Sequence, residues 1–178
     1  MEAVRVPIRR ALEFGIYRDG DNNLDASQSA VLHQARSVSA ENPAIAFTVE
    51  DTSSGAYGAA VTRRATIQDG GEIFERHDSL DDMASPKNLA QFVARTLDNA
   101  EASGARQTWI DLVDHGAGDG GGLQADSFKQ LMPMPQIAQA IADGMKLHAQ
   151  AHPEDAGRKV DGVVANQCLM ASLGFAEG

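Results

Sequence analysis

Two residues with complementary chemistry each lie at the end of an apolar segment of the chain. His115 follows the apolar segment 107–114, and Cys168, the single cysteine, ends the apolar segment 159–168. A histidine beside a cysteine can remove the thiol proton, which makes the sulfur a nucleophile, and can later protonate a leaving amine. Gly116 can offer its N–H to a developing oxyanion, alongside the N–H of Cys168. The pair predicts hydrolysis through a cysteine nucleophile if the two segments are neighbours.

The elements that must position this pair alternate between strand and helix patterns. Alternating strands and helices favour a mainly parallel sheet flanked by helices, a three-layer α/β domain in which chemistry collects at the carboxyl ends of the strands. A hairpin excursion over about 57–77 is predicted around the turn Asp69-Gly70. The expected order is strand 11–18, helix 23–38, strand 44–51, hairpin, helix 86–103, strand 107–114, helix 135–152 and strand 159–168.

Composition excludes several classes of function. The 178 residues suffice for one domain, and 43% are hydrophobic, which is a globular composition. The net charge of −10 and the lack of a basic run argue against nucleic acid and against an anionic membrane surface as partners. One cysteine excludes an internal disulfide framework. No signal-peptide pattern and no apolar window of membrane-spanning length are found, which leaves the location unknown.

The motifs around the pair resemble the clostripain family of cysteine peptidases, in the caspase and gingipain group. "VDHGAG" followed after about 50 residues by "NQCLMAS" has the family's order, histidine first and cysteine second. Upstream, "YRDGDNNLD" and "DDMASPKNLAQFV" resemble two further segments of the family. The resemblance covers roughly residues 13–173.

The resemblance implies a single caspase-like peptidase domain over residues 1–178 whose C-terminal part is missing, so that the chain is a fragment or one processed subunit. It implies that His115 is the general base and acid, Cys168 the nucleophile, and Gly116 part of the oxyanion hole. The implied activity is a cysteine endopeptidase that cuts peptides or proteins after Arg or Lys. The implied partner is a C-terminal segment or second subunit of the same precursor, and the implied location is secreted or extracytoplasmic.

Three features depart from the family pattern or extend it. Asn166 occupies the position where the family usually has an aspartate that recognises a basic substrate residue, so the pocket charge must come from another acid such as Asp126. Gly174 replaces a glutamate that the family often carries. The family often cuts itself between the histidine and cysteine strands, and the candidate processing sites here are Lys146, Arg158 and Lys159.

Two other functions compete with the peptidase. One is a catalytically inactive clostripain-like binding or assembly module, which the departures permit. The other is a hydrolase that uses Asp111 or Asp114 with a metal, which no distant ligand cluster supports. The glycine run at 116–122 lacks the Lys-Ser/Thr of a phosphate-binding loop and is interpreted as a mobile loop beside the site.

No cofactor is required by this interpretation, and no metal site is predicted. The acid-rich turn that follows the first predicted strand does not match the EF-hand template. It is interpreted either as a solvated turn or as a calcium site of another kind. His148 and His152 share a helix face, but "HAQAH" lacks the glutamate of the zinc-protease motif and no third ligand is evident. The acids and amides of the turn are Asp19, Asp21, Asn23 and Asp25.

Overall fold

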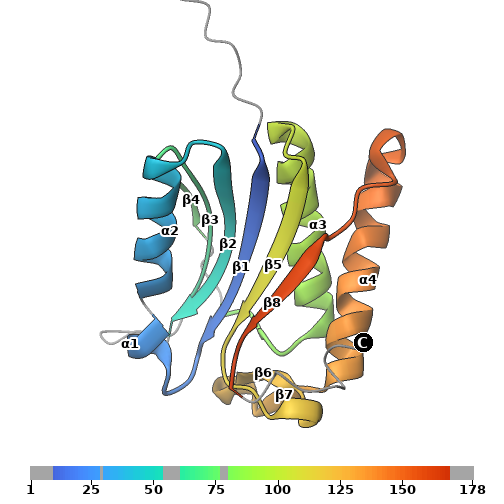
Figure 1. Cartoon of the computed structure of the whole chain (residues 1–178). Helices are drawn as coiled ribbons and strands as arrows, with labels where there is room; N and C mark the ends of the chain where they lie inside the picture. The colour runs from blue at the N-terminus through green and yellow to red at the C-terminus, as the bar shows by residue number, and fades with distance from the viewer. Residues whose placement is uncertain (1–9, 29, 54–60, 77–79, 169–178) are drawn as a thin grey trace, which may run out of the picture.

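A six-stranded sheet carries helices on both faces, as Figure 1 shows. The computed structural model describes residues 10–28, 30–53, 61–76 and 80–168. The strand order is β4-β3-β2-β1-β5-β8, and a separate two-stranded sheet consists of β6 and β7. The strands are β1 (Leu12–Gly20), β2 (Ile45–Ser53), β3 (Val61–Gln68), β4 (Gly71–Arg76), β5 (Gln107–Val113), β6 (Gly122–Ala125), β7 (Gln130–Met132) and β8 (Gly162–Asn166). The helices are α1 (Asp25–Gln28), α2 (Ala30–Glu41), α3 (Pro86–Ser103) and α4 (Met134–Ala151), with the 3₁₀ turns η1 (Gly118–Gly120), η2 (Asp126–Phe128) and η3 (Pro153–Asp155).

The predicted three-layer α/β class is confirmed. Strands β1, β2, β5 and β8 are parallel, and β3 and β4 add an antiparallel hairpin at one edge. Asp69 and Gly70 both have positive φ, at 54° and 74°, which is the geometry of the tight turns that match the twist of paired strands. The parallel strands bring the segments after β1, β5 and β8 to one edge of the sheet, which we call the rim.

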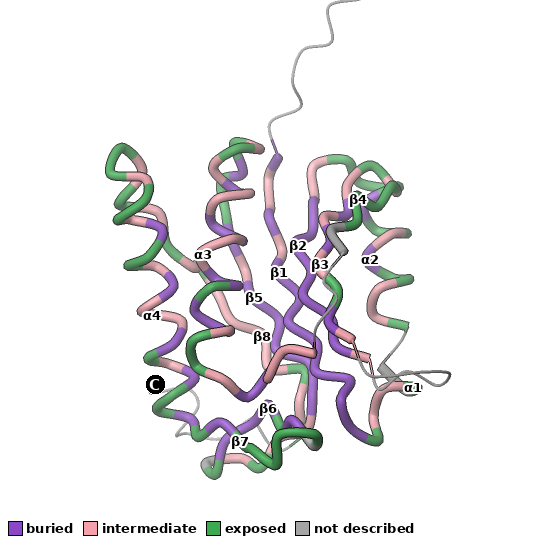
Figure 2. Tube along the Cα trace, turned by 180° about the vertical axis from the view of Figure 1, so that it is seen from behind, coloured by how far each residue is buried: buried purple, intermediate pink, exposed green. Residues whose placement is uncertain are grey.

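Each face of the sheet has its own core, because alternate residues of a buried strand point in opposite directions. Tyr17, Ile110 and Leu112 pack with α3 and α4, whereas Ile16, Val49 and Val113 belong to the core beside α2. Figure 2 shows the buried residues concentrated along the central strands. The central strands are therefore rigid supports for the segments that follow them.

The segment predicted as a helix over 23–38 contains α1 and α2, which lie on either side of residue 29, a position outside the described residues, and the buried face of α2 is rotated from the expected one. Val38 is 40% exposed, whereas Ser39 is buried. The hydroxyl oxygen of Ser39 accepts a hydrogen bond of 3.0 Å from the Gly70 N–H in the β3–β4 turn. Because successive helical residues are about 100° apart, this contact turns Val38 away from the core.

The glycine run is not a simple loop. It forms η1 and leads into the β6–β7 sheet, and Gly116 forms a bridge with Gly122. The Ala117 N–H donates a 2.8 Å hydrogen bond to the Gly121 carbonyl oxygen. Gly121 has a φ of 122°, a conformation that favours glycine and permits the chain to fold back on itself, and the predicted mobility of this loop stays a prediction.

Candidate active site

The register of β5 and β8 places His115 and Cys168 at equivalent positions. The last pair of this parallel ladder is Val113 with Asn166, and His115 and Cys168 each lie two positions beyond one member of that pair. Strand β1 lies on the other side of β5, with Arg18 opposite Val113. The helices that follow β1 and β5 cover opposite faces of the sheet, so the rim beside these strands is a topological switch point, where α/β proteins bind ligands (Figure 1).

His115 is half-buried and is held by the turn after β1. Its Nε2 atom lies 2.6 Å from the side-chain oxygen of Asn23. Because that amide oxygen can only accept, Nε2 carries the proton, and Nδ1 of the neutral ring is the nitrogen with a free lone pair. The contact therefore selects one tautomer and leaves one nitrogen to act as a base.

Asp114 ties three segments together beneath the histidine. Its side chain is only 2% exposed, and Oδ1 accepts hydrogen bonds from the His115 N–H at 2.5 Å and from the Asn22 amide at 2.6 Å. Oδ2 accepts from the N–H of Gln124 in β6. A buried carboxylate with several donors is a strong anchor, because hydrogen bonds to charged groups are about twice as strong as neutral ones. The β1 turn, the tip of β5 and β6 are thereby fixed relative to one another.

Two further aspartates lie beside this anchor. Asp21 accepts from the Ser127 N–H at 2.9 Å and from the Ser127 hydroxyl at 2.8 Å. Asp19 is fully buried, and burial followed by the nearby charge of Asp114 raises its pKa to about 8. The Asp21 N–H donates to Asp19 and opposes this rise of the pKa. Asp19 is therefore predominantly protonated at neutral pH.

Cys168 is exposed, and the residue before it packs against β6. A Cβ atom added to Gly122 would lie 2.4 Å from the side-chain oxygen of Gln167, so the end of the Gln167 side chain lies directly over Gly122. Since Gly122 also bridges to Gly116, the segment after His115 and the segment before Cys168 meet at the same glycine. Among the described residues, none accepts a hydrogen bond from the Gly116 N–H.

A buried acid lies next to the predicted substrate-pocket residue Asn166. Asp111 is 7% exposed, burial raises its pKa to about 6, and its hydrogen bonding with Asn166 opposes that rise. From the sequence, Asp111 was considered only as a metal ligand. The signal that could have found it is an acid at an interior position of an otherwise apolar strand. The other pocket candidate, Asp126, begins η2, and its side chain lies outside the described residues, as does Gly174.

The three predicted processing sites differ in their surroundings. Lys146 is an exposed residue within α4 and pairs with Asp143 at 2.9 Å. Arg158 binds the Asp155 carboxylate and donates a 2.9 Å hydrogen bond to the Ala105 carbonyl oxygen. Lys159 is exposed and lies between η3 and β8.

The side chains of the acid-rich turn point to separate partners. Asn23 contacts His115, Asp21 contacts Ser127, and Asp25 forms a 3.0 Å ion pair with Arg18. Within the described part of the chain, these residues do not form a group of closely spaced ligand atoms. The structure therefore assigns them protein contacts, and calcium binding stays a prediction.

Solved structures of cysteine proteases share this fold. A secreted C11 cysteine protease from Bacteroides thetaiotaomicron is similar with a TM-score of 0.56 and 16% identity over 93% of this chain and 48% of that chain. An inactive zymogen C11 protease from Parabacteroides distasonis is similar with a TM-score of 0.64 and 17% identity over 96% and 46%. The complex of a Bacteroides thetaiotaomicron C11 protease with an irreversible peptide inhibitor has a TM-score of 0.57 and 12% identity over 91% and 44%.

At these identities the likeness establishes the fold, the caspase-like α/β arrangement of the C11 or clostripain proteases. The chain spans slightly less than half the length of each of those chains. No protein-family profile and no curated protein matches the sequence. No described helix combines the length and apolar character needed to cross a membrane.

Proposed function

We propose that this chain carries the dyad of a cysteine endopeptidase, with His115 as general base and acid and Cys168 as nucleophile. The observation that supports it most is the β5–β8 register, which puts both residues two positions past the same ladder pair. The protease-like fold and the switch-point location agree with this assignment. A binding module has no need of both residues at one rim.

In the proposed reaction, Nδ1 of His115 takes the proton of the Cys168 thiol, and the thiolate attacks the carbonyl carbon of the scissile amide. The Gly116 N–H stabilises the oxyanion of the tetrahedral intermediate. The C–N bond then breaks as the imidazolium returns its proton to the leaving amine, which leaves a thioester. A water molecule, deprotonated by His115, hydrolyses the thioester and regenerates the thiol.

Asn23 is proposed as the positioning residue for His115. Its side-chain oxygen lies 2.6 Å from Nε2 and holds the proton there, so that Nδ1 is the basic nitrogen. The same contact stabilises the imidazolium that forms during the reaction, in the way that other peptidases use a third group. Asn23 is exposed at the rim, so substituting it does not open a cavity in the core.

The proposed substrate is a peptide or protein cut after a basic residue. Asn166 is neutral, and we assign the pocket charge to Asp111, which shares a hydrogen bond with Asn166. A cationic side chain beside Asp111 would favour its ionised form, because an opposite charge lowers the pKa of a carboxyl group. Cleavage after Arg or Lys would then depend on Asp111, whereas cleavage after an uncharged residue would not depend on Asp111.

The test is covalent labelling of Cys168 by a thiol-directed peptidyl inhibitor with arginine at the position before the reactive group. We expect labelling to slow by about 100-fold or more in His115→Ala, because general-base assistance of that size is lost.

Asn23→Ala should slow labelling by about tenfold, since one hydrogen bond to a charged ring is removed, and Asn23→Asp should restore it. His33→Ala, a change on an exposed helix position, is the matched control. Equal labelling of His115→Ala and the parent protein would contradict the dyad and favour a non-catalytic module.

A further inference from the structure

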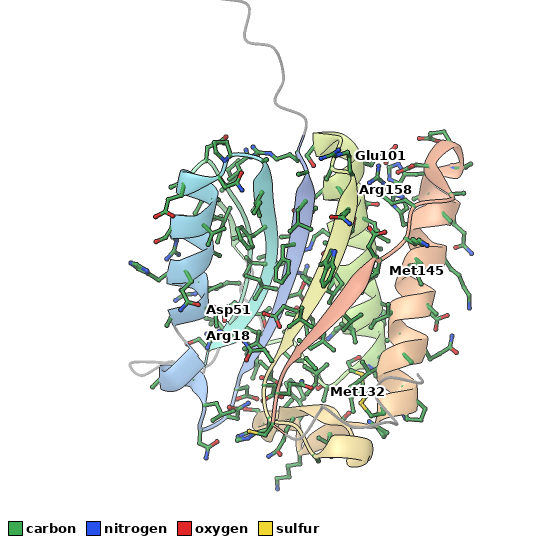
Figure 3. The ribbon with its side chains drawn as sticks, viewed as in Figure 1. Arg18, Asp51, Glu101, Met132, Met145 and Arg158 are labelled. Carbon is green, nitrogen blue, oxygen red and sulfur yellow. The ribbon has the colours of Figure 1, made fainter. Side chains whose placement is uncertain are left out.

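A second cluster of ligating side chains lies at the end of the molecule opposite the rim. The C-terminal ends of α3 and α4 meet there, next to η3, and Figure 3 shows Glu101 and Arg158 at this end, away from Met132 of β7. One ligand atom from each of Glu101, His148 and Asp155 lies within 4.8 Å of the other two. These residues come from three elements, α3, α4 and η3.

His148 is the unusual member of the cluster. It is fully buried, and its Nδ1 atom lies 2.7 Å from the Asp98 carboxylate, so Nδ1 carries a proton in the neutral ring. Nε2 is then a bare lone pair, and it has no hydrogen-bond partner among the described residues. That lone pair faces the Asp155 Oδ2 atom at 3.6 Å. A buried lone pair opposite a carboxylate oxygen is unfavourable, and a cation between the two atoms would remove the repulsion.

The distance of 3.6 Å is informative. It is too long for a hydrogen bond between a ring nitrogen and a carboxylate oxygen. Two ligand atoms that each lie about 2.1 Å from a tetrahedral Zn²⁺ ion are about 3.4 Å apart. The separation of Nε2 and Oδ2 therefore suits two ligands that share one metal ion.

We propose that Glu101, His148 and Asp155 bind one Zn²⁺ ion at this end of the molecule, with His148 Nε2 as its nitrogen ligand. One imidazole with two carboxylates is a ligand set for a borderline transition metal, whereas Ca²⁺ and Mg²⁺ prefer oxygen alone. Two carboxylates balance the charge of the ion. Solvent fills the fourth position, since the Glu101 and Asp155 side chains are 26% and 29% exposed.

The residues around these ligands fit outer-shell roles. Metal-bound histidines almost always donate the other ring N–H to a carboxylate or carbonyl oxygen, and Asp98 accepts from His148 in this way. His152 Nδ1 lies 2.8 Å from Glu101 Oε2 and holds that side chain in place. Arg158 binds the Asp155 carboxylate and holds that side chain in place. The sequence marks no third ligand for the His148/His152 pair, because the acids that lie near these histidines come from α3 and η3, far away in the chain or on another element.

The test is titration of metal-stripped protein with Zn²⁺ by isothermal calorimetry, together with the visible absorption of the Co²⁺ form. We expect one ion per chain, and Glu101→Gln should weaken binding at least tenfold and change the Co²⁺ spectrum. Glu154→Gln is the matched control, because Glu154 is a neighbouring acid that is 70% exposed and is not a proposed ligand. Asp98→Asn should weaken binding by about 10- to 100-fold, the usual effect of losing an outer-shell carboxylate.

Circular dichroism without metal must show that the variants keep the parent fold, and both substituted side chains are partly exposed, so folding is expected to survive. Absence of Zn²⁺ binding to the parent protein would overturn the proposal. It would also be overturned if Glu101→Gln bound the ion as tightly as the parent, or if Glu154→Gln lost as much affinity as Glu101→Gln. The proposal does not depend on peptidase activity, because its readouts are binding and spectra.

Discussion

At the scale of single residues, buried carboxylates determine how the rim is built. Asp114 holds the His115 backbone, Asn22 and β6 together, and Asp21 fastens the turn after β1 to Ser127. Asp19 lies among them with its Oδ2 atom unpartnered within the described structure. Burial and then the nearby charge of Asp114 raise the pKa of Asp19, so its carboxyl group is protonated at neutral pH.

The raised pKa of Asp19 makes stability depend on pH. The pKa of Asp19 is about 8 in the folded protein and 3.8 for an unperturbed aspartate. The contribution of Asp19 to the free energy of unfolding is therefore complete below about pH 4 and is lost as the pH rises toward 8. We expect Asp19→Asn to remove this dependence, so that the parent loses on the order of 5 kcal/mol more than the variant between pH 4 and 8. Urea unfolding at several pH values measures the difference, with Asp143→Asn as the exposed control. Parallel pH profiles for the parent and Asp19→Asn would contradict the prediction.

The strand-end placement of His115 and Cys168 could be predicted from residue type and spacing, but the contacts around them could not. His115 and Cys168 follow recognisable strands, so their strand-end placement could be inferred from local patterns. The contact of His115 with Asn23 joins residues 92 positions apart, and the meeting of Glu101 with Asp155 depends on where two helices end. Such contacts need the packing of whole elements, which periodicity does not encode.

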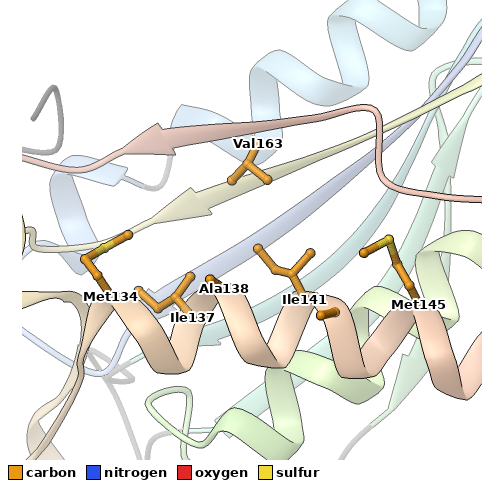
Figure 4. Close-up of a pocket in the computed structure, with 7 residues that line it drawn as sticks. Met134, Ile137, Ala138, Ile141, Met145 and Val163 are labelled. Carbon is orange, nitrogen blue, oxygen red and sulfur yellow. The ribbon is translucent and has the colours of Figure 1, made fainter. Parts of the chain in front are cut away.

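At the scale of elements, close approach between helices decides how the layer beside β5 and β8 is packed. The α3–α4 contact depends on Gly144, because a Cβ atom there would lie 2.5 Å from the Val93 Cβ and 2.6 Å from the Ala90 carbonyl oxygen. On the other side of α4, Met134, Ile141, Met145 and Val163 line an apolar groove of about 300 Å³. Figure 4 shows these side chains between α4 and β8. Helix α4 is thus tightly packed on α3 and loosely packed on β8.

The substitution Gly144→Ala tests this packing. Alanine favours a helix over glycine by about 1 kcal/mol, but overpacking against a backbone carbonyl costs about 1–3 kcal/mol, so we expect net destabilisation. Gly157→Ala is the control, because nothing lies within 4 Å of the added Cβ, and its effect should stay within about 0.5 kcal/mol. The measurement is the free energy of unfolding in urea. A Gly144→Ala protein as stable as the parent would show that α3 and α4 can separate without cost.

Helix and strand positions were predicted well where periodicity was strong. The expected helix stripe from Leu89 to Ala100 is buried, and the α3 helix ends at Gly104, whose φ of 68° is the left-handed conformation that favours glycine. The rotated face of α2 was missed because it depends on the contact between Ser39 and the β3–β4 turn. The β6–β7 sheet was missed because its strands have only four and three residues, which is too short for apolar alternation to be recognised.

At the scale of the whole molecule, the two proposed sites lie at opposite ends of the parallel strands. His115 and Cys168 follow the carboxyl ends of β5 and β8, whereas the proposed zinc ligands surround the segment that leads into the start of β8. That segment also holds two of the three proposed processing sites, Arg158 and Lys159. A metal ion that immobilises η3 would therefore also restrain the connection between β5, which precedes His115, and β8, which precedes Cys168.

Limited digestion with trypsin ranks the three proposed processing sites. We expect the first cut between residues 140 and 168 to follow Lys159, because it is exposed and lies outside helices and strands, where the chain can enter a protease. Cleavage after Arg158 requires release from Asp155 and the Ala105 carbonyl oxygen, and cleavage after Lys146 requires unfolding within α4. Asp155→Asn should therefore raise the share of cuts after Arg158 and leave Lys146 unchanged. Mass spectrometry of the early fragments identifies the order, and a first cut after Lys146 would show that the C-terminal half of α4 opens more readily than the η3–β8 connection.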